Sequence, residues 1–226
     1  MARNRTLAQL RQEVRQRADI ESSNHVTDSE INRYVNQSCA ALHGLIAEAD
    51  EDYLTISTTI TTVAGTGTYA FTGYRIRWVE AVINGLTVRL DRWRFDQRDQ
   101  LINAATRWTS TGAIPLYRYV RGQLSLLPVP DGAYSVTVWH IDPFSDLTFD
   151  SDTFNGEDGW EEWVVLDAAI KCLTKEESDP SALMAERQRV EQRIRAALGT
   201  RDHARPDTAV DTDPNARWWT FGRWSL

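Results

Sequence analysis

The amino-acid sequence predicts an α+β protein in which terminal helices from both chain ends form a helical bundle, with an inserted β-rich module of hairpins and an extended C-terminal tail. Apolar residues spaced three and four apart near both ends indicate amphipathic helices. Between them the sequence is dense in threonine and isoleucine, which favours strands. The expected units are the N-terminal bundle helices (1–52), the inserted β-rich module (53–150), the C-terminal bundle helices (151–199) and a tail with an aromatic anchor (200–226).

Two helices are expected in the first fifty residues. In TLAQLRQEVRQRADI (6–20) the apolar residues keep helical spacing after Thr6, which is suited to an N-cap. A second helix is expected to begin after Thr27, because Glu30 stands three residues further on and completes a capping box. This helix is expected to end near Ala49, before the acidic run DED.

The middle of the chain carries the signals of hairpins. In WVEAVINGLTVRL (78–90), Asn84-Gly85 separates two apolar-rich runs, and this pair favours a type I′ turn because both positions need a positive φ. A short helix is predicted over about 94–105, and a second hairpin should turn near Gly122. The last expected strand is YSVTVWHID (134–142).

Helical periodicity returns near the end of the chain. GWEEWVVLDAAIKCLTKEES (159–178) predicts one helix, with Glu161 and Glu162 at the positive end of its dipole. PSALMAERQRVEQRIRAALG (180–199) predicts another, and Gly199 is a natural stop.

Composition and charge exclude several classes of protein. The net charge of −7 argues against a general nucleic-acid binder. No apolar run approaches the roughly 20 residues of a membrane span, and no signal peptide is recognised, so we expect a soluble chain made in the cytoplasm. The charges are segregated, because residues 142–162 hold eight acidic residues and no basic one, whereas 75–121 hold nine arginines and four acids. Use of the arginines at an interface is one explanation, since the planar guanidinium pairs with carboxylates through two hydrogen bonds; a coding bias toward arginine is the other.

The residues predict no catalytic, cofactor-binding or metal-binding site. The four histidines lack the spacing of a zinc site, and no nucleophile motif or phosphate-binding loop occurs. Cys39 and Cys172 are expected to be buried free thiols. Counted from Asp150, the acidic segment begins like an EF-hand calcium loop, but Phe154 occupies a ligand position and the required glycine comes one residue late. We therefore expect a solvated or interface-facing acidic loop.

The tail combines a spacer, whose composition is typical of disordered segments, with an end that is rich in aromatic residues. RPDTAVDTDPNA (205–216) reads as a spacer, and RWWTFGRWSL (217–226) holds three of the nine tryptophans. An exposed aromatic segment promotes association, so we expect it to dock on a partner; folding back onto its own domain is the alternative. The predicted partner-binding residues are Arg217, Trp218, Trp219, Phe221, Arg223 and Trp224.

Three segments resemble a family of tailed-bacteriophage proteins. They are TLAQLRQEVRQRADIESSNHVTDSEINRYVNQSCAALHGLI (6–46), DGWEEWVVLDAAIKCLTKEESD (158–179) and SALMAERQRVEQRIRAA (181–197). The chain is similar there to head-to-tail adaptor proteins, also called connector or neck proteins, over roughly 6–200.

The resemblance implies a virion protein at the head–tail junction of the capsid vertex. It implies a ring, usually a dodecamer, which sits beneath the portal protein, extends the DNA channel and offers a surface to tail or nozzle proteins. It also implies that a terminal segment clamps the portal, that the helices form the ring wall and that the β module reaches toward the tail. No catalytic residues come with the resemblance. The acidic net charge agrees with DNA that passes without specific binding.

Two other functions remain open from the sequence. A β module could recognise a carbohydrate or a host receptor through surface aromatics such as Trp93 and Trp108. A hydrolase using the acidic segment 146–162 would need a positioned acid/base pair, which the sequence does not indicate.

Overall fold

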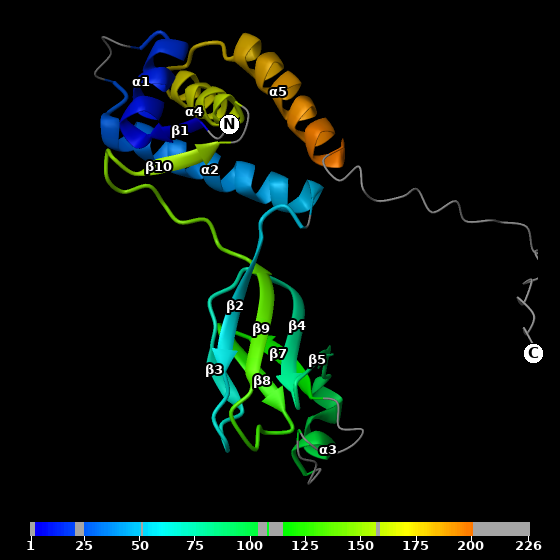
Figure 1. The fold of residues 1–226 in the computed structure, drawn as a ribbon. Coiled ribbons are helices and arrows are strands. Elements are labelled where there is room, and N and C mark those ends of the chain that lie inside the picture. Colours follow the sequence, from blue (N-terminus) through cyan, green and yellow to red (C-terminus); the bar gives the residue numbers. More distant parts are fainter. Residues whose placement is uncertain are drawn as a thin grey trace, which may run out of the picture.

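The computed structural model describes residues 3–20, 25–50, 52–103, 108, 115–156 and 159–200. It confirms the α+β class. A group of helices stands at one end of the molecule and a β module at the other, with a connection after α2 and another before β10 (Figure 1). The helices are α1 (Leu7–Arg17), α2 (Asp28–Ala49), α3 (Arg98–Asn103), α4 (Glu161–Lys175) and α5 (Ser181–Thr200), and a 3-10 turn (Phe95–Gln97) precedes α3.

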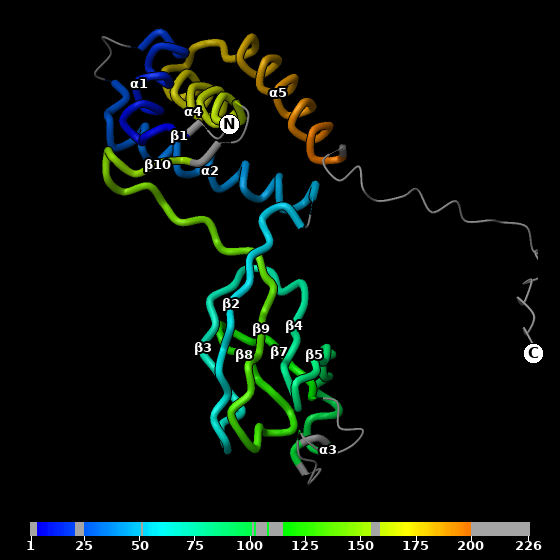
Figure 2. Tube along the Cα trace, in the orientation of Figure 1, coloured from blue at the N-terminus to red at the C-terminus, as the bar shows by residue number. Residues whose placement is uncertain are grey.

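The helices α1, α2, α4 and α5 share one apolar core, although the β module separates the first two from the last two in sequence. Figure 2 shows the helices from the first and the last part of the described chain packed together. The core takes buried residues from each helix, among them Leu10 and Val14 of α1, Leu42 of α2, Leu166 of α4 and Ile194 of α5. Leu7, Leu10, Leu42, Leu166 and Ile194 are wholly or almost wholly inaccessible to solvent. This core is what holds the two ends of the chain together.

Both predicted N-caps are present. The Thr6 side chain accepts a hydrogen bond from the Gln9 amide at the start of α1. At α2, Thr27 Oγ1 accepts from the Glu30 amide, and the Glu30 carboxylate accepts from the Thr27 amide, which completes the capping box. Lys175 of α4 binds the same carboxylate at 2.8 Å and so joins this cap to the helical core.

Removing the cap of α2 should weaken the fold. Thr27→Ala leaves the Glu30 amide without its acceptor, and we expect a loss of about 1 kcal/mol in the free energy of unfolding. Thr27→Ser keeps the hydroxyl and should stay within about 0.5 kcal/mol of the parent. Urea unfolding followed by circular dichroism measures both variants. Equal losses in the two variants would show that the hydroxyl does not carry the effect.

The β module contains two four-stranded sheets. The first has the order β2-β9-β4-β5 and the second the order β3-β8-β7-β6. The strands of the first sheet are β2 (Thr55–Thr61), β9 (Ser135–Ile141), β4 (Arg75–Ile83) and β5 (Leu86–Arg89); those of the second are β3 (Thr68–Ala70), β8 (Gln123–Leu127), β7 (Leu116–Val120) and β6 (Asp91–Arg92). Side chains of both sheets form a second apolar core, separate from that of the helices, with Val79 and Val138 from the first sheet and Leu124 and Leu126 from the second.

Both predicted hairpins are confirmed. Asn84 and Gly85 have φ values of 52° and 78°, and Ile83 pairs with Leu86 across the turn. Glycine is needed at the second position because side chains other than those of asparagine and aspartate resist positive φ. The second hairpin turns at Arg121-Gly122, between β7 and β8.

One small sheet was not predicted. β1 (Arg3–Thr6) pairs antiparallel with β10 (Thr153–Gly156), so the start of the chain is fixed to the segment that precedes α4. The expectation of an acidic loop is therefore wrong for residues 153–156, which form β10, whereas Glu161 and Glu162 begin the helix that the sequence predicts. Strands of four residues are too short to show a clear alternation of polarity.

Candidate interaction surfaces

The predicted partner-binding residues lie outside the described part of the chain. They are Arg217, Trp218, Trp219, Phe221, Arg223 and Trp224. The structure does describe the contacts of the other candidates, which are Trp93, Trp108 and most of the acidic and arginine-rich segments.

Trp93 and Trp108 are buried, so the alternative in which they bind a sugar or receptor as surface aromatics is wrong for these two residues. They are 3% and 1% exposed. Trp108 stacks on Tyr134 with a ring-centroid distance of 5.0 Å, and its Nε1 donates to the Pro128 carbonyl at 2.7 Å. The guanidinium of Arg118 lies 5.4 Å from the Trp93 ring centroid. Both indoles therefore belong to the packing of the β module.

Two acidic residues before α4, Asp150 and Asp152, accept hydrogen bonds from other residues of the same chain. Asp150 receives two hydrogen bonds from the Arg11 guanidinium, at 3.0 and 3.1 Å. Asp152 accepts the backbone amides of Thr148 and Phe149 at 2.7 and 2.8 Å, and these bonds lower the pKa of its carboxyl. Both carboxylates hold the segment before β10 in place. Over the described ranges, no group of three or more His, Cys, Asp or Glu side chains could hold a metal ion.

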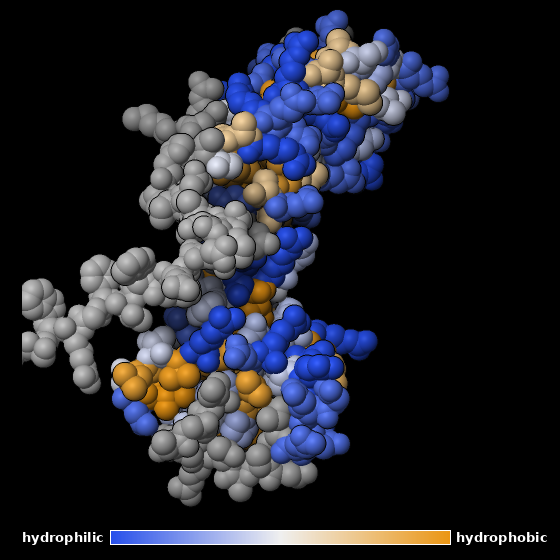
Figure 3. Space-filling view, turned by 90° about the vertical axis from the view of Figure 1, so that its right-hand side faces the viewer, coloured by the Kyte–Doolittle hydropathy of each residue, from blue (hydrophilic) through white to orange (hydrophobic). Residues whose placement is uncertain are grey.

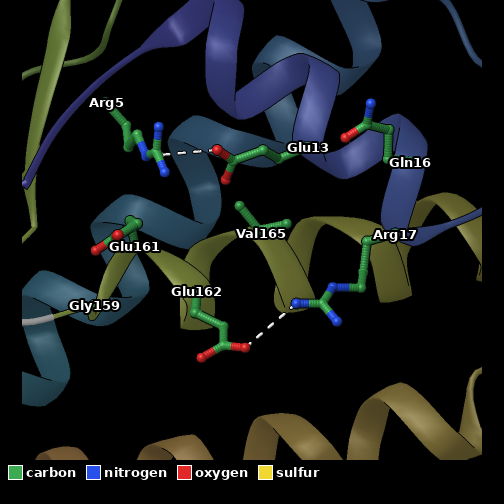
Figure 4. Close-up of a pocket in the computed structure, with 8 residues that line it drawn as sticks. All are labelled: Arg5, Glu13, Gln16, Arg17, Gly159, Glu161, Glu162 and Val165. Carbon is green, nitrogen blue, oxygen red and sulfur yellow. Dashed lines mark hydrogen bonds and ion pairs between the residues drawn. The ribbon is translucent and has the colours of Figure 1, made fainter.

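A cavity of about 520 Å³ lies where β1, α1 and α4 meet (Figure 4). Its walls carry opposite charges that pair across it: Arg5 lies 3.5 Å from Glu13, and Arg17 lies 3.3 Å from Glu162. These ion pairs link β1 and α4 to α1. The residues that line the cavity are Arg5, Glu13, Gln16, Arg17, Gly159, Glu161, Glu162 and Val165. None of these side chains is a hydroxyl, thiol or imidazole, and two of the three glutamates, Glu13 and Glu162, are held in ion pairs with arginines.

The arginine-rich segment also makes local ion pairs. Arg77 binds Asp52 at 3.5 Å, and Arg89 binds Asp91 at 3.3 Å. Several charges of the two segments therefore have partners within the same chain, and head-to-tail contact between copies stays a prediction. Exposed pairs of this kind contribute little to stability.

A buried carboxylate joins three helices. Asp167 of α4 accepts hydrogen bonds from Ser38 of α2 at 2.8 Å and from Arg187 of α5, and Lys171 lies 2.8 Å from it. Burial alone would raise the pKa of Asp167, but the hydrogen bonds from Lys171, Ser38 and Arg187 outweigh it and hold the pKa below its usual value. The carboxylate is thus charged and fully partnered at neutral pH. Sequence analysis missed this residue, although a lone aspartate in an apolar helix is the signal for it.

Two other tryptophans lie at the surface of the first sheet. Trp78 of β4 and Trp139 of β9 are direct neighbours in the register and are 40% and 39% exposed. The guanidinium of Arg89 lies 4.1 Å from the Trp78 ring centroid, and Trp139 Nε1 donates to Glu80 at 3.2 Å. The alternation in WVEAVI (78–83) was the available signal, because it places Trp78, Glu80 and Val82 on the face opposite Val79 and Ala81.

These tryptophans are part of a shallow cavity of about 560 Å³ on the outer face of the first sheet. It is lined by Asp52, Thr55, Arg77, Trp78, Glu80 and Trp139, which we call the indole shelf. Val82 and Leu86 are exposed further along the same sheet. Figure 3, which faces the side of the molecule that carries β5 and α3, shows hydrophobic residues gathered at the surface of the β module. The module therefore offers apolar surface to a ligand or partner.

Comparison with known families decides the class of this protein. The family model of the SU10 adaptor protein matches residues 5–217, which include both the helices and the β module. The chain belongs to the SU10 adaptor protein family. This confirms the resemblance to phage head-to-tail adaptor proteins, a family of structural neck proteins and not of enzymes. A search of curated proteins finds no match to the chain.

Membership of the family also indicates where in the phage this SU10 adaptor belongs. It implies association with the portal and tail components of a phage, and hence a component of the virion. Among the helices that the structure describes, none has both the length and the apolar character to cross a bilayer. The family match ends at residue 217, so the aromatic residues after Arg217 must be judged by their own chemistry.

Proposed function

We propose that this SU10 adaptor assembles as a dodecameric ring beneath the portal protein, extends the DNA channel and provides the surface on which tail or nozzle proteins attach. The observation that carries this proposal is the family match over 5–217, because it spans both folded units. The protein would be made in the host cytoplasm and end at the head–tail junction of the virion.

The two separate apolar cores support different roles for the helical bundle and for the β module. The helices of 1–52 and 151–199 would form the bundle that makes the ring wall, and the β module of 53–150 would face the tail. Each unit has its own apolar core, so each can present a rigid surface to a different partner. The net charge of −7 agrees with a channel through which DNA slides, because like charges disfavour contacts with phosphate.

The tail of 200–226 would anchor the ring to the portal. Its spacer contains two prolines and few apolar residues, which gives reach without a fixed structure. Its last ten residues contain three tryptophans, a phenylalanine and two arginines, the residue types that most often dominate binding energy at interfaces. We assign Arg217, Trp218, Trp219, Phe221, Arg223 and Trp224 to this contact.

The experiment that tests this function mixes the full chain with the portal protein of the same virus and measures the mass and symmetry of the complex by native mass spectrometry and electron microscopy. We expect a closed ring of adaptors with twelve copies on the portal. Replacing Trp218, Trp219, Phe221 and Trp224 together by serine should reduce portal affinity at least about a hundredfold, since each buried anchor is worth ~2 kcal/mol or more. Val210→Ser, in the spacer, is the matched control and should bind like the parent. A chain that never binds portal would contradict the proposal.

A further inference from the structure

The indole shelf leaves two large aromatic side chains half exposed on a folded unit. Trp78 and Trp139 are paired in the register of adjacent strands and line the same shallow cavity, so they can contact one ligand together. Neighbouring exposed aromatic residues on a soluble protein mark a place where another group binds. The buried indoles of Trp93 and Trp108 show by contrast what packing within this module looks like.

The charges of the shelf favour a ligand that brings cations and aromatic rings. Asp52 has a side chain that is 88% exposed, and its ion pair with Arg77 is long, at 3.5 Å. Glu80 holds the Trp139 indole at 3.2 Å with one carboxylate oxygen. A docking segment with arginines could bind these two carboxylates while its rings pack edge-to-face on the two indoles.

The chain itself contains such a segment, and the described helix that precedes it, α5, ends near the end of α2. Leu198 near the end of α5 shares the helical core with Leu45 and Ile46 near the end of α2. Figure 1 shows α5 ending on the side of the molecule where α2 ends and the connection to β2 begins. Asp52 lies in that connection, three residues after the last residue of α2.

The spacer gives the aromatic segment a long reach from the end of α5. Sixteen residues, 201–216, separate α5 from Arg217. A flexible chain of that length spans about 20 Å on average and ~50 Å when fully extended. The effective concentration of a segment held on such a tether is about millimolar, so a weak site is enough to retain it.

We propose that in the unassembled protein residues 217–224 dock on the indole shelf of their own chain. Trp218, Trp219, Phe221 and Trp224 pack on Trp78 and Trp139, and Arg217 and Arg223 bind Glu80 and Asp52. Docking covers both adhesive surfaces, which keeps free chains from associating before assembly. That the portal later takes the tail from the shelf rests on the proposed function, whereas the docking itself does not.

Limited tryptic digestion of the full chain, followed by mass spectrometry, tests the docking without any portal. Docking should protect the bonds after Arg217 and Arg223, and cleavage after Arg201 in the spacer is the internal reference. In the double variant Trp78→Thr, Trp139→Thr, cleavage after Arg217 and Arg223 relative to Arg201 should rise about tenfold, because cleavage follows the population of the undocked state. Val120→Thr, an exposed strand residue of the second sheet, is the matched control and should leave the ratio unchanged.

A second measurement does not depend on the folding of the shelf variants. Hydroxyl-radical footprinting of the variant with Trp218, Trp219, Phe221 and Trp224 replaced by serine should show oxidation of Trp78 and Trp139 several times that in the parent. Oxidation of the buried Trp93 and Trp108 should not change. Equal oxidation of Trp78 and Trp139 in the parent and the variant would overturn the proposal. Protection that disappears on dilution would overturn the same-chain assignment and indicate the shelf of a second copy.

Tail docking and portal binding are measured separately, so either proposal can fail without the other. An unprotected tail in a chain that still binds portal would refute only the docking. A protected tail in a chain that does not bind portal would refute only the adaptor role.

Discussion

Asp167→Ala should destabilise the protein by about 3 kcal/mol. The substitution removes the acceptor for Ser38, Lys171 and Arg187 at once and leaves two cations without their carboxylate between α2, α4 and α5. Breaking a buried ion pair from one side costs more than the pair contributes, because the remaining charges stay poorly solvated. Partial exposure of Lys171 and Arg187 keeps the expected loss at the lower end of the usual range.

Urea unfolding at pH 7 measures the loss, and Glu191→Ala is the control. Glu191 forms an exposed pair with Arg195 within α5, so its removal should cost less than about 0.5 kcal/mol. An Asp167→Ala variant as stable as the control would show that the network does not hold the helices together.

Asp167→Ala should also change how the stability of the protein depends on pH. The pKa of Asp167 is lower in the folded protein than in the unfolded chain. The stability that this carboxylate contributes is therefore complete above the unfolded pKa of about 4 and is lost as the pH falls through the folded value. The difference in stability between the parent and Asp167→Ala should shrink below about pH 4. A difference that grows on acidification would contradict the assigned direction.

Trp108→Ala should destabilise the β module by about 3–5 kcal/mol. The side chain is buried in the second core, stacks on Tyr134 and donates a hydrogen bond to the Pro128 carbonyl. Alanine leaves a cavity where the indole was and removes the donor. Trp108→Phe keeps most of the apolar volume and should cost clearly less.

Hydrogen exchange measures this effect where it should occur. The amides of β9 should exchange faster in Trp108→Ala, whereas those of α4 should be unchanged because they belong to the other core. Unchanged exchange in β9 would show that Trp108 does not stabilise the core of the β module.

The features that could be predicted from sequence are those encoded within a few residues. The Thr27–Glu30 capping box and the Asn84-Gly85 hairpin each need only a local pattern and a backbone preference. The four helices around the β module also follow from local periodicity. For the same reason, the adaptor resemblance rests on helical segments near both ends, and the family match confirms it.

The features that could not be predicted from sequence depend on contacts between distant parts of the chain. β1 and β10 form a sheet only because the fold brings the start of the chain to residues 153–156. The burial of Trp108 could not be read from its own segment, because its partners Pro128 and Tyr134 lie twenty or more residues further along the chain. Pairing of Arg11 with Asp150 likewise could not be read from the segregation of charge along the sequence.

The most direct test of the adaptor role is co-sedimentation with the portal protein of the same virus, using the full chain and a truncation after Thr200. The truncation keeps every described helix and strand and removes only the tail. We predict that the full chain sediments with the portal and that the truncation does not. Binding by neither protein would contradict the adaptor role, and equal binding by both would contradict the assignment of the aromatic tail to the portal.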